Sequence, residues 1–206
     1  MNQLPNVRIE DRPTPIVSTH RSSPELPGGA ERGGLWSLIR GDLKEKSAWL
    51  YGATSRRALL KTLATDGTFA MIIYRFMQAS QRHRLVPFSM IFNKLNGIFG
   101  GCVIGRGADF GPGFVLVHSN GVVINGAVRG GRNIKMEHQV TLGAEGFQSP
   151  ILGNDIFIGA GAKIVGAVSI GSRVRVGANA VVIADVPDGA TAVGVPARNI
   201  IRNPTD

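Results

Sequence analysis

The sequence has little cysteine, few aromatic residues and no long apolar run. Cys102 is the one cysteine among 206 residues, which excludes an intrachain disulfide framework and a cysteine-rich metal site. Aromatic residues make up 6% of the chain. The most apolar stretch, residues 85–105, is interrupted by Pro87, Asn93 and Lys94, so it falls short of the roughly 20 apolar residues of a transmembrane helix. The start of the chain also lacks the apolar segment of a secretory signal. These absences predict a soluble, cytoplasmic protein.

Acidic residues are scarce beside basic ones. The chain has 14 Asp plus Glu against 23 Lys plus Arg, a formal net charge of +9. Residues 1–102 hold 14 basic and 7 acidic side chains, so most of the excess lies there. A basic surface suits contact with the anionic inner face of a membrane, and it serves solubility equally well. Nucleic acid is not an expected partner, because the basic residues are not interleaved with aromatics and no binding motif occurs.

Composition divides the chain into segments. Residues 1–34 hold five prolines and four arginines without an apolar period, which predicts a disordered basic tail. Residues 35–102 predict a small α-helical domain, since apolar residues recur there at three- and four-residue intervals. The expected helical stretches are 35–43, 55–80 with a break at Asp66-Gly67, and 87–99.

The second half contains a six-residue repeat. Of fourteen positions taken at every sixth residue, thirteen are large and apolar: Ile104, Phe110, Leu116, Val122, Val128, Ile134, Val140, Leu152, Ile158, Ile164, Ile170, Val176 and Val182. This pattern is typical of a solenoid in which the apolar residue points inward and three units close a coil of about 18 residues. The exception is Gly146, so residues 144–150 are expected to loop out. We therefore predict a mostly β fold, with a parallel β-helix over residues 103–187 and a C-terminal extension over 188–206.

The repeat and its motifs resemble the serine acetyltransferase family of hexapeptide-repeat acyltransferases. The resemblance covers roughly residues 36–200, and its most specific segments are 36–43, Tyr74-Arg75, 118–124, 140–143, 158–163 and 194–198. It implies a left-handed parallel β-helix behind a small helical domain. It also implies a homotrimer or a pair of trimers, with acetyl-CoA as co-substrate in the groove between neighbouring β-helices. The short helical region favours the trimer.

The resemblance also implies site residues. His118 matches the family's catalytic histidine, a general base that takes the proton of an acceptor hydroxyl while its oxygen attacks the thioester. An imidazole, with an ordinary pKa of about 6.5, suits that role at neutral pH. The expected acetyl-CoA contacts are Gly143, Gly159, Ala160, Gly177 and Ala178, with Arg175 and Arg198 for the phosphates. The glycines are equally explained by coil corners that need small residues.

Several positions depart from the family pattern. Val117 stands where the family has an Asp before the histidine, and residues 51–53 stand where it has Asp-Pro-Ala. These two carboxylates contact the amino-acid acceptor in the family, and burying an unpaired ammonium costs several kcal/mol. Val103 replaces the Asp that partners the histidine, and residues 144–150 lack the family's second histidine. Serine is therefore expected to be a poor acceptor.

A second histidine, His138, lies 20 residues after His118. A coil of about 18 residues would stack it above Asn120, a candidate substrate contact, near the face that carries His118. The short loop and this histidine resemble the colanic-acid and exopolysaccharide O-acetyltransferase branch, whose sugar acceptors present hydroxyls and no ammonium. We therefore predict an acetyl-CoA-dependent O-acetyltransferase acting on a saccharide of an exopolysaccharide or related glycan, with His118 and His138 as catalytic residues.

Two other functions stay open at this point. One is serine O-acetylation in cysteine biosynthesis. The other is a non-catalytic hexapeptide-repeat scaffold, which the missing Asp partner makes credible because His118 could then be a structural histidine. A metal site would need three converging histidines, and only two are candidates, so no metal is expected.

Overall fold

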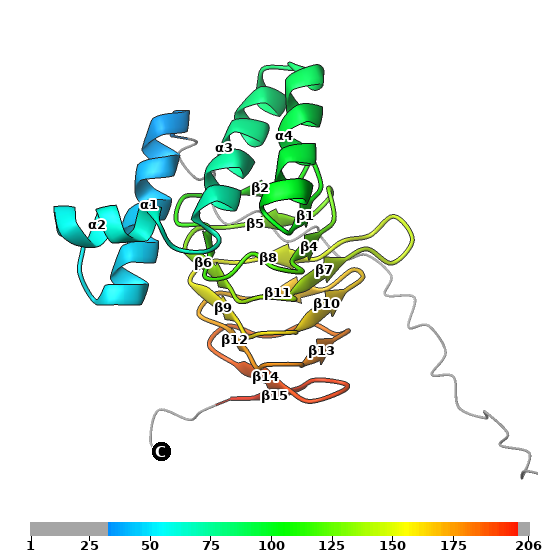
Figure 1. Ribbon diagram of the computed structural model, residues 1–206. Helices are drawn as coiled ribbons and strands as arrows, with labels where there is room; N and C mark the ends of the chain where they lie inside the picture. The colour runs from blue at the N-terminus through cyan, green and yellow to red at the C-terminus, as the bar shows by residue number, and fades with distance from the viewer. Residues whose placement is uncertain (1–32, 202–206) are drawn as a thin grey trace, which may run out of the picture.

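The computed structural model describes residues 33–201, which form a stack of parallel coils capped at one end by helices (Figure 1). The helices are α1 (Leu35–Tyr51), α2 (Arg56–Leu63), α3 (Thr68–Arg82) and α4 (Val86–Phe99). They lie where the apolar periodicity predicts them, and the break at Asp66-Gly67 separates α2 from α3. The predicted basic tail, residues 1–34, lies outside the described residues except for its last two.

Short strands form three sheets, and each of the first four coils adds one strand to each sheet. Sheet A holds β1 (Val103–Ile104), β4 (Val123–Ile124), β7 (Thr141–Gly143), β10 (Lys163–Val165) and β13 (Val181–Val182). Sheet B holds β2 (Asp109–Phe110), β5 (Arg129–Gly130), β8 (Ile151–Leu152) and β11 (Ser169–Ile170). Sheet C holds β3 (Val115–Leu116), β6 (Ile134–Met136), β9 (Ile156–Ile158), β12 (Arg175–Val176), β14 (Thr191–Val193) and β15 (Arg198–Ile200).

The predicted fold class, a hexapeptide-repeat β-helix behind a small helical domain, is confirmed. Among the strands of residues 33–201, all pairs between coils are parallel, and only β15 runs antiparallel, against β14. The boundary that the sequence places at residue 187 falls inside the last coil, because β14 still pairs in parallel with β12. The residues between β7 and β8 leave the coil, as the interrupted repeat at Gly146 predicts.

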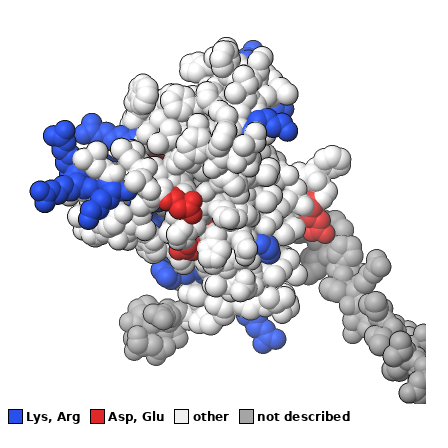
Figure 2. Space-filling view, viewed as in Figure 1, with Lys and Arg blue, Asp and Glu red and all other residues white. Residues whose placement is uncertain are grey.

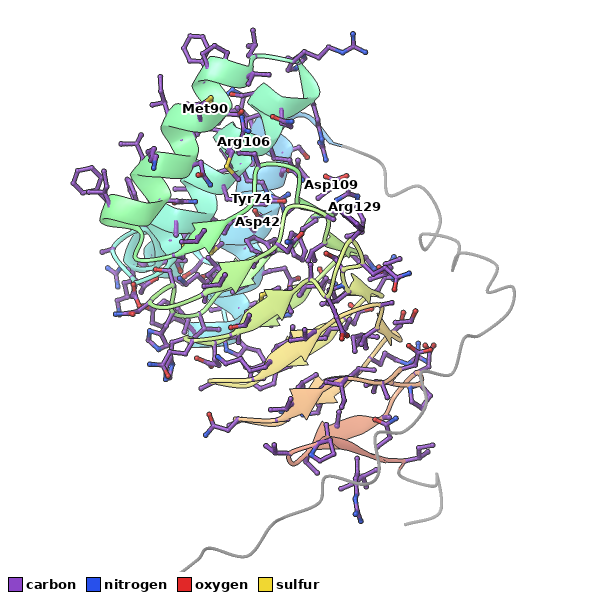
Figure 3. All side chains as sticks on the ribbon, turned by 90° about the vertical axis from the view of Figure 1, so that its right-hand side faces the viewer. Asp42, Tyr74, Met90, Arg106, Asp109 and Arg129 are labelled. Carbon is purple, nitrogen blue, oxygen red and sulfur yellow. The ribbon has the colours of Figure 1, made fainter. Side chains whose placement is uncertain are left out.

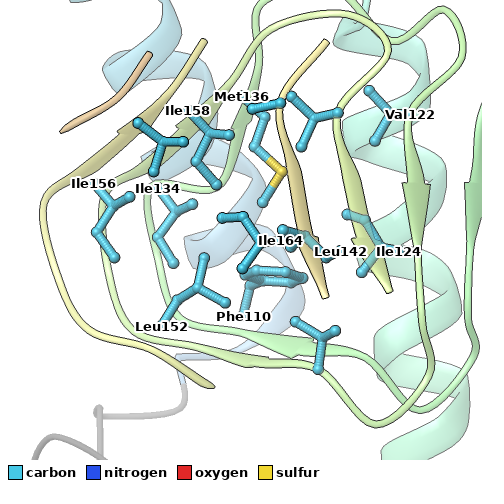
Figure 4. Close-up of a cluster of buried hydrophobic side chains, with 14 of the residues drawn as sticks. Phe110, Val122, Ile124, Ile134, Met136, Leu142, Leu152, Ile156, Ile158 and Ile164 are labelled. Carbon is cyan, nitrogen blue, oxygen red and sulfur yellow. The ribbon is translucent and has the colours of Figure 1, made fainter. Parts of the chain in front are cut away.

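An aliphatic column fills the solenoid. The thirteen apolar residues of the repeat are all buried, none of them more than 3% exposed. Ile124, Leu142 and Ile164 occupy equivalent positions in successive coils, and Figure 4 shows them side by side in the interior. Burial of such a side chain contributes about 1.5–3 kcal/mol. The column therefore supplies the main driving force for stacking the coils, and no single coil could bury its apolar face alone.

A buried polar layer joins the helices to the first coil. Arg75 on α3 donates through Nε and Nη2 to the Asp42 carboxylate on α1, at 2.6 and 2.9 Å. The same guanidinium donates to the main-chain carbonyls of Phe110 and Gly111. Figure 3 shows Asp42 and the neighbouring Tyr74 between the helices and the solenoid. Two segments that carry the family resemblance thus serve to dock the helices.

On the face shown in Figure 2, Lys and Arg side chains gather over α2, where Arg56, Arg57 and Lys61 are exposed. Among residues 33–201, no helix combines the length and apolar character that crossing a membrane requires.

Candidate active site

His118 faces a carboxylate that comes from the helical region. The histidine lies at the corner between β3 and β4, and Asp66 lies in the turn between α2 and α3. His118 Nδ1 is 3.0 Å from Asp66 Oδ2, and the two side chains are 53% and 54% exposed. The sequence marks Asp66 only as a helix break. The only local signal was the Asp-Gly pair itself, which indicates a turn and says nothing of a contact with His118.

The turn that carries Asp66 is held close to strand β3. The amide of Gly67 donates to Asp66 Oδ1 at 2.7 Å, which turns Oδ2 toward the histidine. Gly67 has a φ of 75°, and a Cβ on it would lie 2.5 Å from the Leu116 carbonyl oxygen. Only glycine fits both this conformation and this approach. The glycine therefore brings the turn to the coil corner that carries His118.

The electrostatics of the pair assign its protons. Partial burial raises the pKa of Asp66, but the hydrogen bonds from His118 and Gly67 and the charges of His118 and Lys46 lower it, leaving it below its ordinary value of 3.8. An ionised carboxylate only accepts hydrogen bonds, so His118 Nδ1 must carry the hydrogen between the two groups. In the neutral imidazole, Nε2 then keeps its lone pair. This is the tautomer that a general base needs.

The depressed pKa of Asp66 is directly measurable. Replacing His118 by Ala removes a hydrogen bond and a positive charge, so the pKa of the Asp66 carboxyl should rise. Because the folded-state pKa is the lower one, the pair stabilises the fold above the unfolded-state pKa of about 3.9, and this stabilisation is lost as the pH falls through the folded-state value. Carboxyl ¹³C titration of both proteins checks the direction, and an unchanged Asp66 pKa would contradict the pairing.

The pair opens into a pocket of about 400 Å³. Its lining residues are Asp66, His118, Asn120, His138 and Gln139. The rings of the two histidines lie 6.0 Å apart between centroids, at 73° to each other. The structure thus brings together three residues that the sequence singles out, His118, His138 and Asn120, and adds the acid that the sequence did not identify.

His138 aligns with Asn120 in the next coil, as the sequence predicts. The Gln139 amide donates to the Asn120 carbonyl at 2.9 Å, and a Cβ on Gly121 would lie 3.5 Å from the Gln139 Cα. Gly121 is therefore aligned with Gln139, and Asn120 with His138. The corner between β3 and β4 is two residues longer than the corner between β6 and β7, and this longer corner carries His118.

The predicted small residues of the acetyl-CoA site lie at the same corner, in later coils. They are Gly159 and Ala160 after β9, and Gly177 and Ala178 after β12. The amide of Gly161 donates to the His138 carbonyl, which links one of these coils directly to the pocket. A Cβ on Gly159 would lie 2.7 Å from the Ala178 amide nitrogen. Close coil packing therefore already requires glycine there, and the corner forms a strip of small residues running away from the histidines.

The structure places the three other predicted acetyl-CoA contacts apart from the pocket lining. Gly143 ends β7 in sheet A. Arg175 on β12 lies over the Phe157 ring, with its guanidinium carbon 4.9 Å from the ring centroid. Arg198 lies exposed on β15, at the end of the stack opposite the helices (Figure 1). Within residues 33–201, no three His, Cys, Asp or Glu side chains are grouped to hold a metal ion.

Comparisons of sequence and of structure with known proteins agree with one another. Residues 149–184 match the family described as bacterial transferase hexapeptide (six repeats). The chain is 38% identical over 145 residues to a serine acetyltransferase of Helicobacter pylori, covering 68% of this chain and 85% of that protein. It is also similar to soybean serine acetyltransferase in complex with serine, with a TM-score of 0.74 and 31% identity over 81% of this chain and 69% of that one. A serine acetyltransferase in complex with CoA matches with a TM-score of 0.70 and 25% identity over 78% of this chain and 68% of that one.

These relatives overturn the predicted saccharide acceptor. The proteins to which the chain is similar are serine acetyltransferases, and they do not support the exopolysaccharide branch, polysaccharide biosynthesis or the membrane contact. The prediction failed because it sought carboxylates only at Val117 and residues 51–53. In the structure, the carboxylate in the pocket belongs to Asp66, in the turn between α2 and α3.

Proposed function

The chain belongs to the serine acetyltransferase family, and from this premise we propose that it transfers the acetyl group of acetyl-CoA to the hydroxyl of L-serine. Family membership confirms the predicted enzyme class, an acyltransferase that moves acetyl from acetyl-CoA to a hydroxyl. The observation that carries the proposal is the contact between Asp66 and His118 in an open pocket.

The proposed reaction is a direct transfer. His118 Nε2 accepts the proton of the serine hydroxyl while the oxygen attacks the thioester carbonyl carbon. The Asp66 carboxylate holds the imidazole at Nδ1 and stabilises its protonated form. The tetrahedral intermediate then collapses, the carbon–sulfur bond breaks, and the imidazolium returns its proton to the departing thiolate. The products are O-acetylserine and CoA, and a positioned general base contributes about 10²- to 10⁴-fold to such a step.

Asp66 also removes the main objection to serine. An amino-acid ammonium needs an anionic partner in the pocket, because burying it unpaired is costly. The Asp66 side chain is about half exposed. Each carboxylate oxygen offers two lone pairs, so Oδ1 and Oδ2 keep acceptor capacity beyond their contacts with Gly67 and His118. One carboxylate can therefore orient the base and meet the ammonium of the acceptor.

The remaining site assignments are part of the same proposal. His138 stays a candidate catalytic residue and Asn120 a candidate substrate contact, since both line the pocket. The corner strip of small residues is proposed to receive the pantetheine arm, and Gly143, Arg175 and Arg198 to contact other parts of acetyl-CoA. A homotrimer with acetyl-CoA between neighbouring solenoids, and a cytoplasmic location, remain predictions.

The scaffold alternative loses its basis. It rested on a His118 without an acidic partner, and Asp66 is that partner. The proposed function is tested by measuring thiol release from acetyl-CoA with L-serine and with a panel of saccharides in parallel. We expect turnover with L-serine. Turnover with a saccharide and none with L-serine would contradict the proposal. Absence of turnover with every acceptor tested would contradict it too.

Replacing Asp66 by Asn should reduce kcat for L-serine by about ten- to a thousand-fold, because a neutral amide fixes neither the tautomer nor the charge of the imidazole. The KM for acetyl-CoA should change little. Asp155→Asn is the matched control, since that carboxylate pairs with Arg132 on the solenoid surface and does not line the pocket. An equal loss in both variants, or none in either, would contradict the role of Asp66.

A further inference from the structure

Lys46 is a fully buried cation beside the site. It lies on α1, and its side chain has no exposed surface. Its ammonium donates to the main-chain carbonyl of Leu116 at 2.8 Å and to the main-chain carbonyl of Asp66. The first carbonyl lies two residues before His118. The second belongs to the residue whose carboxylate meets that histidine.

This arrangement is unfavourable for a lysine that has only a structural role. Burial lowers the pKa of Lys46 to about 8, although the negative charge of Asp66 opposes the shift. Within residues 33–201, the hydrogen-bond partners of the ammonium are neutral carbonyls, and a buried ammonium that donates to no carboxylate is costly. An apolar side chain could fill the same volume without that cost. What the ammonium adds is a buried link between the main chains of these two segments, beside the exposed side-chain contact of Asp66 with His118.

We propose that Lys46 is a positioning residue: by holding the carbonyls of Asp66 and Leu116 together, it fixes the α2–α3 turn against strand β3 and so keeps the Asp66 carboxylate on His118 Nδ1. We call Lys46 and the two carbonyls that it holds the clamp. Gly67 is needed for it, because a Cβ there would meet both the Leu116 carbonyl oxygen, at 2.5 Å, and the Lys46 ammonium nitrogen, at 3.2 Å. The consequence for catalysis rests on the proposed function, whereas the state of the His118 ring can be measured without any substrate.

The chain offers a matched control. Lys135 on β6 also links the solenoid to α1, through an ion pair of 3.2 Å with Glu45. In the described part of the chain, Lys135 makes no hydrogen bond or ion pair with Asp66 or Leu116, and it does not line the pocket. Lys135→Met therefore removes a lysine from the same helix–solenoid contact and leaves the clamp intact.

The test compares wild type, Lys46→Met and Lys135→Met by ¹⁵N NMR of the histidine rings, at a pH where the imidazole of His118 is neutral, with His118→Ala to assign the signals. We expect the hydrogen of His118 on Nδ1 in wild type and Lys135→Met. In Lys46→Met we expect it to be redistributed to Nε2, with kcat for L-serine at least about ten-fold lower and the KM for acetyl-CoA nearly unchanged.

A wild-type ring spectrum in Lys46→Met, or the same change in Lys135→Met, would overturn the proposal. Because Lys46→Met leaves two buried carbonyls without a donor, folding is checked by thermal unfolding. If it fails, Lys46→Gln, which keeps one amide donor, takes its place with the same two outcomes. If wild type shows no turnover with L-serine, the proposed function fails, and the ring spectra still decide the role of Lys46.

Discussion

Replacing His118 by Ala should lower kcat for acetylation of L-serine by about 10²- to 10⁴-fold, the usual contribution of a positioned general base. The variant keeps the pocket and Asp66 but has no group at the corner between β3 and β4 to take the hydroxyl proton. The KM for acetyl-CoA should stay close to that of wild type, since the strip of small residues proposed for the pantetheine arm is unchanged. Steady-state thiol release measures both constants.

The control for this experiment is His83→Ala. His83 is exposed at the C-terminal end of α3 and does not line the pocket, so its removal should leave kcat unchanged. Folding of His118→Ala should be nearly normal because that side chain is half exposed. A loss of less than about ten-fold with normal folding would show that His118 is not the general base.

Replacing Asp42 by Ala should lower the free energy of unfolding by about 3–5 kcal/mol, the usual effect of removing one partner from a buried ion pair. The change leaves the Arg75 guanidinium buried without its carboxylate, and Arg75 is 1% exposed. It also removes an acceptor from the amides of Gly113 and Phe114. Domain stabilities are about 5–15 kcal/mol, so this single change should remove a large part of the free energy of unfolding.

Urea denaturation at fixed protein concentration measures this effect, since assembly would make stability depend on concentration. Arg132→Gln is the matched control. Arg132 and Asp155 are largely exposed and 4.0 Å apart, and exposed pairs contribute at most about 1 kcal/mol. If the two variants lost similar amounts, the buried layer would not be what holds the helices to the solenoid.

The solenoid could be predicted because its signal is local and repeated. Many apolar residues, such as Ile104 and Val182, recur at six-residue intervals and support the same prediction. A single exception, such as Gly146, therefore does not change it. The family could be predicted for a related reason. Its segments keep residue types that the fold needs, including the Arg75 that the structure shows buried against Asp42.

The partner of His118 could not be predicted in the same way. Asp66 lies 52 residues earlier in the chain, in a turn between helices, and the contact depends on how α1 and α3 sit on the first coil. No local period encodes that placement. The absence of an acid at Val103 therefore suggested a histidine without a partner, and the absence at Val117 suggested an acceptor without an ammonium. Both inferences considered only the positions at which the family carries its acids, and Asp66 is at none of them.

The corner that carries His118 shows a second limit. Counting every sixth residue predicts Val122 as the equivalent of Ile104, but two additional residues between β3 and β4 make Ile124 its partner. The displacement is hidden in the sequence because Val122 and Ile124 are both apolar and both buried. A regular repeat therefore predicts which residues form the core better than it predicts the register between coils.

The central claim is that this chain acetylates the hydroxyl of serine. It is tested most directly by supplying acetyl-CoA labelled with ¹³C in the acetyl group, together with L-serine and a saccharide mixture in one reaction, and identifying the labelled product by mass spectrometry. The predicted result is label on O-acetylserine, formed by wild type and not by His118→Ala. Label on a saccharide, with none on serine, would contradict the claim.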